Sequence, residues 1–379
     1  MARDRYVINH ERAEWVVRTL ISAWKQKLPP FDHAEPVPGR LPKTLSPGSI
    51  QHAVWLMVGL LYMRGRIDSA QAFLRLCDVY DEHPWMFDPQ TFRGRGFKLM
   101  WLRAEMHWIL REHGLGFNVR ETIRFWDFNL RKLACFWDGN PLKIFEEATD
   151  YEALCKIFMI GKGDPESSTG FMGLRHKMVS MYLYFLINAK LVPPMTHPGP
   201  VDTHNIRVMA STEVVVAKEG MGPGARYEFY DVSPAVREIY LTYCTTVEDT
   251  LALADALWYL SRDLCSMSQG NSSSTSGYRG RATEVFARDV IWPQSQVERY
   301  SRSCGICPVE GNCKWTLPSA TQYNQGYLEI RGERPKPHAE QKKLVLIEKR
   351  IENRGPKPVA RKWSAEDEYP HMHQTSLLD

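Results

Sequence analysis

Apolar residues recur at three- and four-residue intervals along most of the chain, a spacing that places them on one face of a helix. The pattern covers 11–26, 49–65, 67–81, 99–114, 119–137, 150–160, 174–190 and 249–265. Alternation with period two is scarce: 208–220 and 227–232 are compatible with short strands, and no sheet is evident. The sequence therefore predicts a mostly α fold.

The amino-acid composition bears on where the protein is located in the cell but does not determine its function. Of 379 residues, 44% are hydrophobic and 11% aromatic, and the formal charge of +4 permits nucleic-acid binding without requiring it. The N-terminal segment lacks the apolar region of a signal peptide, and no apolar stretch is as long as a membrane span. We therefore expect a soluble, cytoplasmic protein with no membrane partner.

The cysteines indicate a metal centre, because disulfides are rare in a reducing compartment. Cys304, Cys307 and Cys313 form a C-x2-C-x5-C group. Three thiolates are an incomplete set, since structural zinc sites and iron–sulfur clusters normally take four protein ligands. Three other cysteines lie singly in apolar helical patterns and are expected in the core: Cys77, Cys135 and Cys155.

A second candidate site lies in the stretch GPVDTHNIRVMAST, residues 199–212. It follows a Pro-rich loop, and its pattern predicts a helix with Asp202 as the N-cap and His204 in the first turn. Taken alone, this observation favours a purely structural role, because Asp is a common N-cap residue.

The two segments together resemble the helix–hairpin–helix DNA glycosylase superfamily, in its endonuclease III-like branch with a [4Fe–4S] cluster. In that family a V-D-T-H-x-x-R-V segment carries the catalytic aspartate, and a glycine-rich hairpin upstream binds DNA phosphates and supplies a lysine. The resemblance implies a two-lobed helical fold with a C-terminal cluster loop. It assigns catalysis to Asp202 and Lys177, the first hairpin glycine to Gly173, and three cluster ligands to the cysteine group.

The fourth ligand departs from the family spacing, which would place it at Val297. The helix that ends in DALWYLSRDLC makes Cys265 the candidate, with 266–303 inserted before Cys304, and Cys244 is the competitor. A long insertion adds little to the loop-closure entropy. Zinc bound by the same four thiolates is the alternative to the cluster.

The hairpin also departs from the family, whose second glycine is replaced by Arg175 in the run Gly173-Leu174-Arg175-His176-Lys177. Three cationic or titratable side chains then lie at a helix N-terminus, a position that binds anions. This run, with the P-V-D-x-H segment, resembles the bacteriophage thymine-hypermodification pyrophosphorylases, or amino acid:DNA transferases. The resemblance implies phosphate or substrate binding by Gly173, Arg175, His176, His204 and Arg207.

The expected function is therefore DNA base modification. As a transferase, the protein would place an amino acid or polyamine on pyrophosphorylated 5-hydroxymethyluracil and release pyrophosphate. The alternatives are a DNA glycosylase, with or without lyase activity, and a non-enzymatic DNA-binding relative. Both enzymes need a flipped or single-stranded modified pyrimidine, and the transferase needs a small amine co-substrate. The setting would be the bacterial host cytoplasm if the gene belongs to a phage.

The same reasoning divides the chain into five expected parts. These are an N-terminal helix and Pro-rich connection over 1–48, the helical lobes with hairpin and catalytic Asp over 49–265, a flexible insertion over 266–303, the cluster loop over 304–330, and a basic, partly disordered tail over 331–379.

Overall fold

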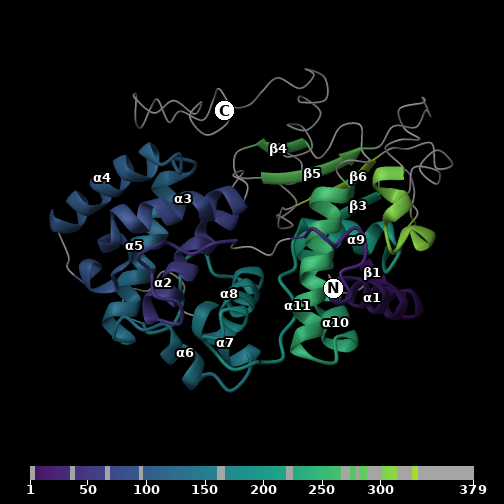
Figure 1. The fold of residues 1–379 in the computed structure, drawn as a ribbon, viewed down its shortest axis with the longest axis horizontal. Helices are drawn as coiled ribbons and strands as arrows, with labels where there is room; N and C mark the ends of the chain where they lie inside the picture. The colour runs from purple at the N-terminus through teal and green to yellow at the C-terminus, as the bar shows by residue number, and fades with distance from the viewer. Residues whose placement is uncertain are drawn as a thin grey trace, which may run out of the picture. The chain divides into compact units, whose positions relative to one another are not determined.

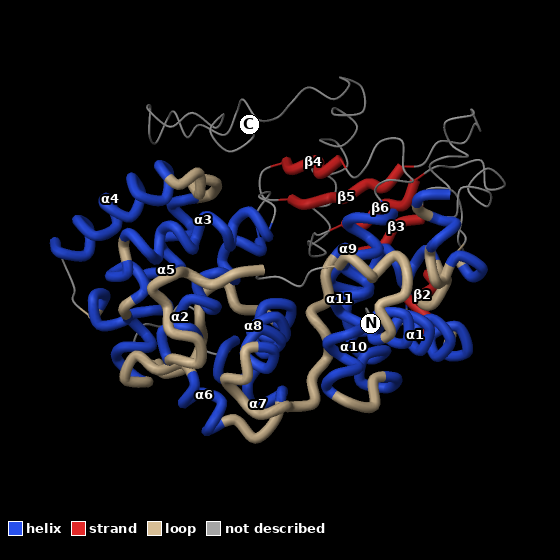
Figure 2. Tube along the Cα trace, viewed as in Figure 1, coloured by secondary structure: helices blue, strands red, loops and turns tan. Residues whose placement is uncertain are grey.

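The computed structural model describes residues 5–34, 39–64, 69–93, 97–159, 167–218, 225–265, 274–278, 281–287, 301–313 and 327–331. Helices dominate these residues (Figures 1 and 2), which confirms the mostly α prediction. The described residues up to Ala34 and from Val201 onward form one compact unit, here the terminal unit. Those from 39 to Pro200 form another, the middle unit. The division at 200/201 falls inside the expected 49–265 range.

The middle unit is helical. Its helices are α2 (Ile50–Gly59), α3 (Ser69–Glu82), α4 (Phe97–Glu112), α5 (Val119–Phe136), α6 (Leu142–Glu147), α7 (Tyr151–Met159) and α8 (His176–Asn188), with 3₁₀ turns at Leu60–Arg64, Pro84–Phe87 and Pro89–Phe92. Aromatic side chains join them: the ring of Phe73 lies 5.3 Å from that of Trp55 and 5.5 Å from that of Phe185. These edge-on contacts between α2, α3 and α8 form the centre of its core.

Two expectations for this unit are corrected. The predicted helix over 49–65 changes to a 3₁₀ turn after Gly59, where a Cβ would come within 2.3 Å of a ring carbon of Phe73, so only glycine fits beside that ring. Cys77 and Cys155 are buried as expected, but Cys135 is exposed. Leu133 is buried two residues earlier on α5, and a 100° step per residue turns Cys135 away from that face.

The terminal unit combines segments from the two ends of the chain. Its elements are β1 (Tyr6–Ile8), α1 (His10–Lys25), α9 (Thr203–Ser211), β2 (Val215–Ala217), β3 (Ala225–Glu228), α10 (Phe229–Tyr243), α11 (Val247–Tyr259), a π turn (Leu260–Leu264), β4 (Ser274–Tyr278), β5 (Arg281–Ala287), 3₁₀ turns at Cys304–Ile306 and Glu310–Asn312, and β6 (Tyr327–Arg331). Helix α1 packs against α11, whose start is fixed by a reciprocal capping box between Thr246 and Asp249.

Two small sheets complete this unit. Strands β1 and β2 pair antiparallel, and a second sheet has the order β3-β6-β5-β4, in which β3 and β6 are parallel. Strands β4 and β5 lie within the range expected to be a flexible insertion, so the sheet is a feature that the sequence did not make evident. The expected tail beyond 331 lies outside the described residues. Among the described helices, none has the length and apolarity needed to cross a membrane.

Candidate functional site

Asp202 is the N-cap of α9, which confirms the local prediction. One oxygen of its carboxylate, Oδ1, accepts hydrogen bonds from the backbone N–H groups of His204 (2.9 Å) and Asn205 (3.1 Å). The Asn205 side chain accepts in return from the backbone N–H of Asp202 at 2.9 Å, which closes a capping box. Asp202 is only 8% exposed, so the carboxylate is held in one orientation in a largely water-excluded setting.

Tyr240 places a phenol near this carboxylate. Burial raises its pKa well above the ordinary value, and the charges of Cys244, Asp202 and Asp255 raise it further. The phenol therefore stays protonated, and its hydroxyl has no hydrogen-bond partner among the described residues. A neutral O–H group within electrostatic reach of Asp202 is a feature that the sequence reasoning missed.

The first turn of α9 is joined to the π turn at the end of α11. The ring Nδ1 of His204 lies 3.0 Å from the hydroxyl of Ser261, and the guanidinium of Arg207 donates to the Ser261 carbonyl at 2.9 Å. Arg207 is 4% exposed, so its charge lies inside the unit. The structure thus gives both residues a contact that positions α9, and the same π turn leads directly into Cys265. π-Helical segments are rare and often occur at functional sites.

The four candidate cysteine ligands lie near one another in the terminal unit. Burial raises the pKa of the Cys307 thiol well above its ordinary value, and the charges of Cys265, Cys313 and Cys304 raise it further. A hydrogen bond from the backbone N–H of Val309 acts in the opposite direction. A thiol must lose its proton to become a metal ligand, so metal binding at Cys307 would be coupled to proton release.

The spacing of these thiols bears on the kind of metal group they fit. A single tetrahedral zinc ion at 2.3 Å from each sulfur would bring its thiolates to about 3.8 Å from one another. Among the described residues, one group of three potential metal-ligand atoms lies within 4.8 Å of one another, and this group contains no cysteine. In a [4Fe–4S] cluster each thiolate binds its own iron, so the four sulfurs lie farther apart than those around one zinc ion.

Cys244, the competing fourth ligand, has different surroundings. Burial raises the pKa of its thiol to about 12, and a side-chain hydrogen bond with Thr250 lowers it. The remaining influences on its pKa are the charges of Asp249 and Lys25. The charge of Cys265 raises the pKa of Cys307, and Cys244 is not among the groups that affect it, so Cys265 is the one of the two that lies within electrostatic reach of Cys307.

The cysteine segment also contacts the far end of α9. Arg12 of α1 donates from Nη1 to the carbonyl of Asn312 (3.2 Å), beside Cys313, and to the carbonyl of Thr212 (3.3 Å), which ends α9. The same nitrogen pairs with Glu213 at 3.1 Å. Helix α9 is therefore connected to the cysteine group at its start through Ser261 and at its end through Arg12. Sequence reasoning had no local signal for this arginine.

The basic run of the sequence lies in the middle unit, at the N-terminus of α8. Gly173 has φ +80°, a left-handed conformation that favours glycine. Arg175 is the exposed N-cap residue, and its side chain makes no capping bond. His176 lies with Nδ1 at 3.5 Å from the sulfur of Cys155, and Lys177 is half-buried. The predicted helix over 174–190 thus begins at His176, which leaves Arg175 at the anion-favouring end.

Helix α5 holds the loop that leads into this turn. Asn129 donates to the carbonyl of Met172 at 2.9 Å and accepts from its N–H at 2.8 Å. Lys132 donates to the carbonyls of Ser167 and Thr169, each at 2.6 Å. Asn129 and Lys132 are both at most 3% exposed. Polar residues on the apolar face of the 119–137 pattern were the available signal for this anchoring role, and the sequence reasoning missed it.

Replacing Gly173 with Ala is expected to destabilise the middle unit by about 1 kcal/mol, because a Cβ strains a backbone with positive φ. Urea unfolding of the variant would measure the loss. The control is Gly39→Ala: no atom lies within 4 Å of an added Cβ there, so stability should change by less than about 0.5 kcal/mol. Equal stability of the two variants would contradict a conformational role for Gly173.

The candidate residues therefore fall into two groups. Asp202, His204, Arg207 and the four cysteines belong to the terminal unit, and the Gly173–Lys177 run belongs to the middle unit. Within the terminal unit, the structure brings the start of α9 and the cysteine group together through shared contacts. Comparison with known proteins adds no relative: no family profile matches the chain, and no curated protein or solved structure matches it.

Proposed function

We propose that the protein is a DNA base-modifying transferase, which replaces the pyrophosphate of pyrophosphorylated 5-hydroxymethyluracil with an amino acid or polyamine nitrogen. The observation that carries the proposal is the setting of Asp202. Its carboxylate is buried, is oriented by a capping box, and lies on a helix that is tied at both ends to the cysteine group. A base-handling site with a structural metal group accounts for all three features.

The cysteine group would hold a [4Fe–4S] cluster through Cys265, Cys304, Cys307 and Cys313. Its contribution would be structural, cross-linking the end of α11 to the 301–313 segment. Because Ser261 and Arg12 connect these same segments to α9, the cluster would fix the position of the helix that carries Asp202. His204 and Arg207 then act by positioning that helix.

The proposed reaction exchanges one bond at the 5-methylene carbon. The carbon–oxygen bond breaks with its electron pair leaving on pyrophosphate, and the amine lone pair forms the new carbon–nitrogen bond. Asp202 accepts the proton that the amine loses. In the middle unit, Arg175, His176 and Lys177 would bind a phosphate anion, since an exposed arginine at a helix N-terminus adds a full charge to the helix dipole.

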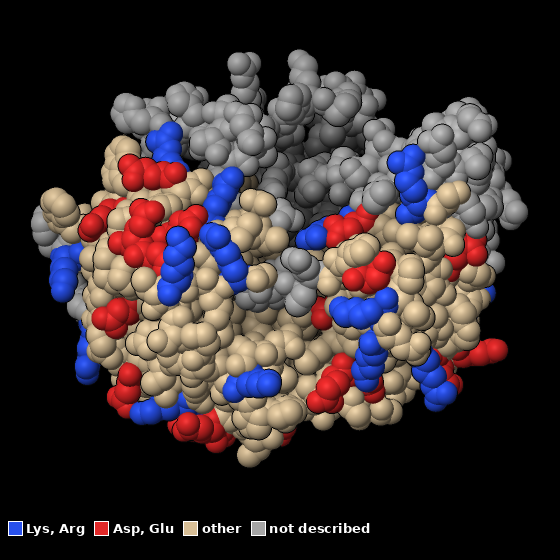
Figure 3. Space-filling model, in the orientation of Figure 1, with Lys and Arg blue, Asp and Glu red and all other residues tan. Residues whose placement is uncertain are grey.

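In this proposal, individual residues contact DNA rather than one large basic surface. On the face drawn in Figure 3, Lys and Arg side chains are interspersed with Asp and Glu rather than gathered in one patch. We expect the reacting base to leave the helical stack or to come from single-stranded DNA, because enzymes that do chemistry on a base commonly take it out of the stack.

A DNA glycosylase is the second candidate, and the half-buried Lys177 beside Arg175 is the observation that favours it. A lysine amine at this position could serve as the nucleophile that attacks the sugar in the lyase reaction. In that reaction, the carboxylate of Asp202 would stabilise the positive charge that develops on the sugar.

Mass spectrometry of nucleosides distinguishes the two reactions. The full chain is incubated with DNA containing pyrophosphorylated 5-hydroxymethyluracil and an amine, and the DNA is digested to nucleosides. The transferase yields an aminated thymidine with its glycosidic bond intact. Release of a free base, or an enzyme–DNA adduct trapped by borohydride, would establish the glycosylase and overturn the transferase.

A further inference from the structure

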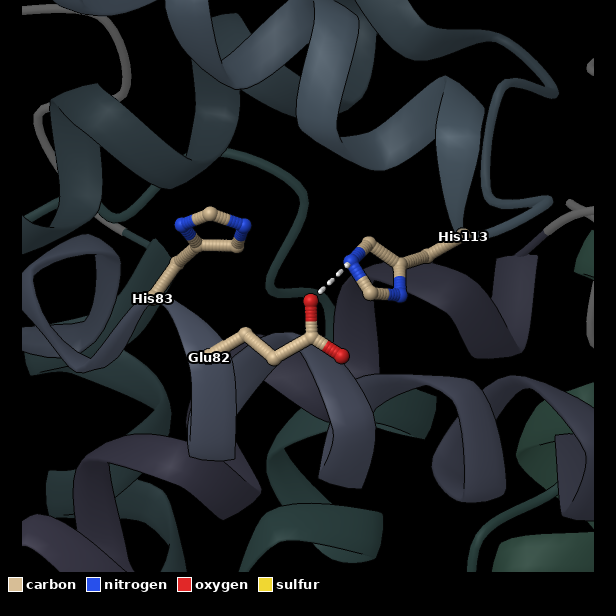
Figure 4. Close-up of side chains that lie close together, drawn as sticks. All are labelled: Glu82, His83 and His113. Atoms are coloured by element: carbon tan, nitrogen blue, oxygen red, sulfur yellow. Dashed lines mark ion pairs between the residues drawn. The ribbon is translucent and has the colours of Figure 1, made fainter.

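Two histidines and a glutamate of the middle unit meet outside the residues considered so far. One ligand atom from each of Glu82, His83 and His113 lies within 4.8 Å of the other two. The Glu82 carboxylate pairs with Nε2 of His113 at 3.5 Å, and the rings of His83 and His113 lie 6.0 Å apart, edge to face. Figure 4 shows the carboxylate between the two rings. Glu82 and His83 are adjacent, whereas His113 lies 30 positions after His83, so no motif spacing in the sequence indicated this group.

The backbone at both ends of this group is fixed. His83 immediately follows α3, and its N–H donates to the carbonyl of Val79 at 2.8 Å. His113 immediately follows α4, and its N–H donates to the carbonyl of Ile109 at 3.1 Å. Arg75 in the middle of α3 donates to the carbonyl of Gly114 at 2.5 Å, which links α3 to the backbone just after α4. The three ligands therefore project from backbone that is already in place.

The electrostatic setting favours a cation. Helices α3 and α4 both end here, and a helix C-terminus carries partial negative charge. Glu82 adds a full negative charge, with its side chain 62% exposed and therefore accessible to ions from solvent. His83 and His113 are half-buried, which leaves their rings partly open to solvent.

We propose that Glu82, His83 and His113 bind a divalent transition-metal ion of the zinc, nickel or copper class. Two imidazoles and one carboxylate match the preferences of these ions and not those of Mg²⁺, which favours oxygen ligands. Ligand distances near 2.1 Å would bring the three atoms to about 3.4 Å from one another, a shift that side-chain rotation at the surface supplies. Three protein ligands leave a coordination position for water or another oxygen donor.

Titration calorimetry with Zn²⁺ tests the site, using the full chain with its cysteine group intact. Wild type should bind one zinc ion that His83→Asn and His113→Asn each bind at least about 100-fold more weakly. The matched control is His33→Asn. His33 pairs with Asp32 at 3.3 Å, which places one imidazole beside one carboxylate on the surface without a second imidazole. Replacing His33 should therefore leave the zinc affinity unchanged.

A thermal readout separates this site from zinc bound at the cysteines. Zinc should raise the midpoint of unfolding in wild type and in His33→Asn by more than in His113→Asn, because the ion joins the ends of α3 and α4. Mg²⁺ should have no such effect. Equal zinc binding by wild type and both site variants, or an equal loss in His33→Asn, would overturn the proposal.

Discussion

Asp202→Asn is expected to reduce the rate of base modification by at least about 100-fold while leaving the protein as stable as wild type. The loss follows because an amide cannot accept the proton that a general base removes, a contribution worth roughly 10²–10⁴ in rate. Stability is retained because Asn is as good an N-cap as Asp. Both backbone hydrogen bonds at the start of α9 go to Oδ1, an oxygen that Asn also has.

The comparison with Asp202→Ala separates chemistry from capping. Alanine removes the cap as well as the carboxylate. It should lower the free energy of unfolding by about 1 kcal/mol and also reduce the rate of base modification. If Asp202 only caps α9, Asp202→Asn will be fully active and Asp202→Ala will be merely less stable. Rate measurements with urea unfolding on both variants decide between these outcomes.

Cys265→Ser is expected to lose the iron–sulfur cluster. A serine hydroxyl does not replace the thiolate, and three cysteines do not complete a four-ligand site. Because the segments that hold the cluster also hold α9, the variant should lose modification activity together with its metal. Iron and acid-labile sulfide analysis of protein purified without oxygen should show about four irons per chain in wild type.

Cys244→Ser is the matched control for this loss. Cys244 is also a partly buried cysteine of the terminal unit, but its surroundings are Thr250, Asp249 and Lys25 rather than the other thiols. It should keep its full iron content and brown colour. Loss of iron from Cys244→Ser with retention in Cys265→Ser would reverse the ligand assignment, and one zinc per chain in wild type would exclude the cluster.

Local features of this fold were predictable from sequence, and tertiary ones were not. The 119–137 pattern gave α5 (Val119–Phe136), and Asp202 was correctly identified as an N-cap, because both depend on neighbouring residues. The pairing of β3 with β6 was missed because β6 lies about 100 residues after β3 in the sequence. No pattern within a strand of four or five residues reports a partner at that distance.

The candidate site shows the same difference between local features, which the sequence predicts, and tertiary features, which it does not. The C-x2-C-x5-C group and the aspartate segment were visible as motifs, whereas the neighbourhood of Cys265 and Cys307 depends on how α11 packs. Arg207 illustrates the limit most clearly. Its sequence position suggested a phosphate contact, but the helix turns it inward to the Ser261 carbonyl. Burial of a charged side chain is set by tertiary packing and has no local signature.

The account is tested most directly by measuring amine incorporation and pyrophosphate release in one reaction. Metal-loaded full chain is mixed with a labelled amine and DNA that contains pyrophosphorylated 5-hydroxymethyluracil. The account predicts equal amounts of incorporated amine and released pyrophosphate, with no free base, and the loss of both products in Asp202→Asn. Accumulation of free base without amine incorporation, or unchanged products in Asp202→Asn, would contradict it.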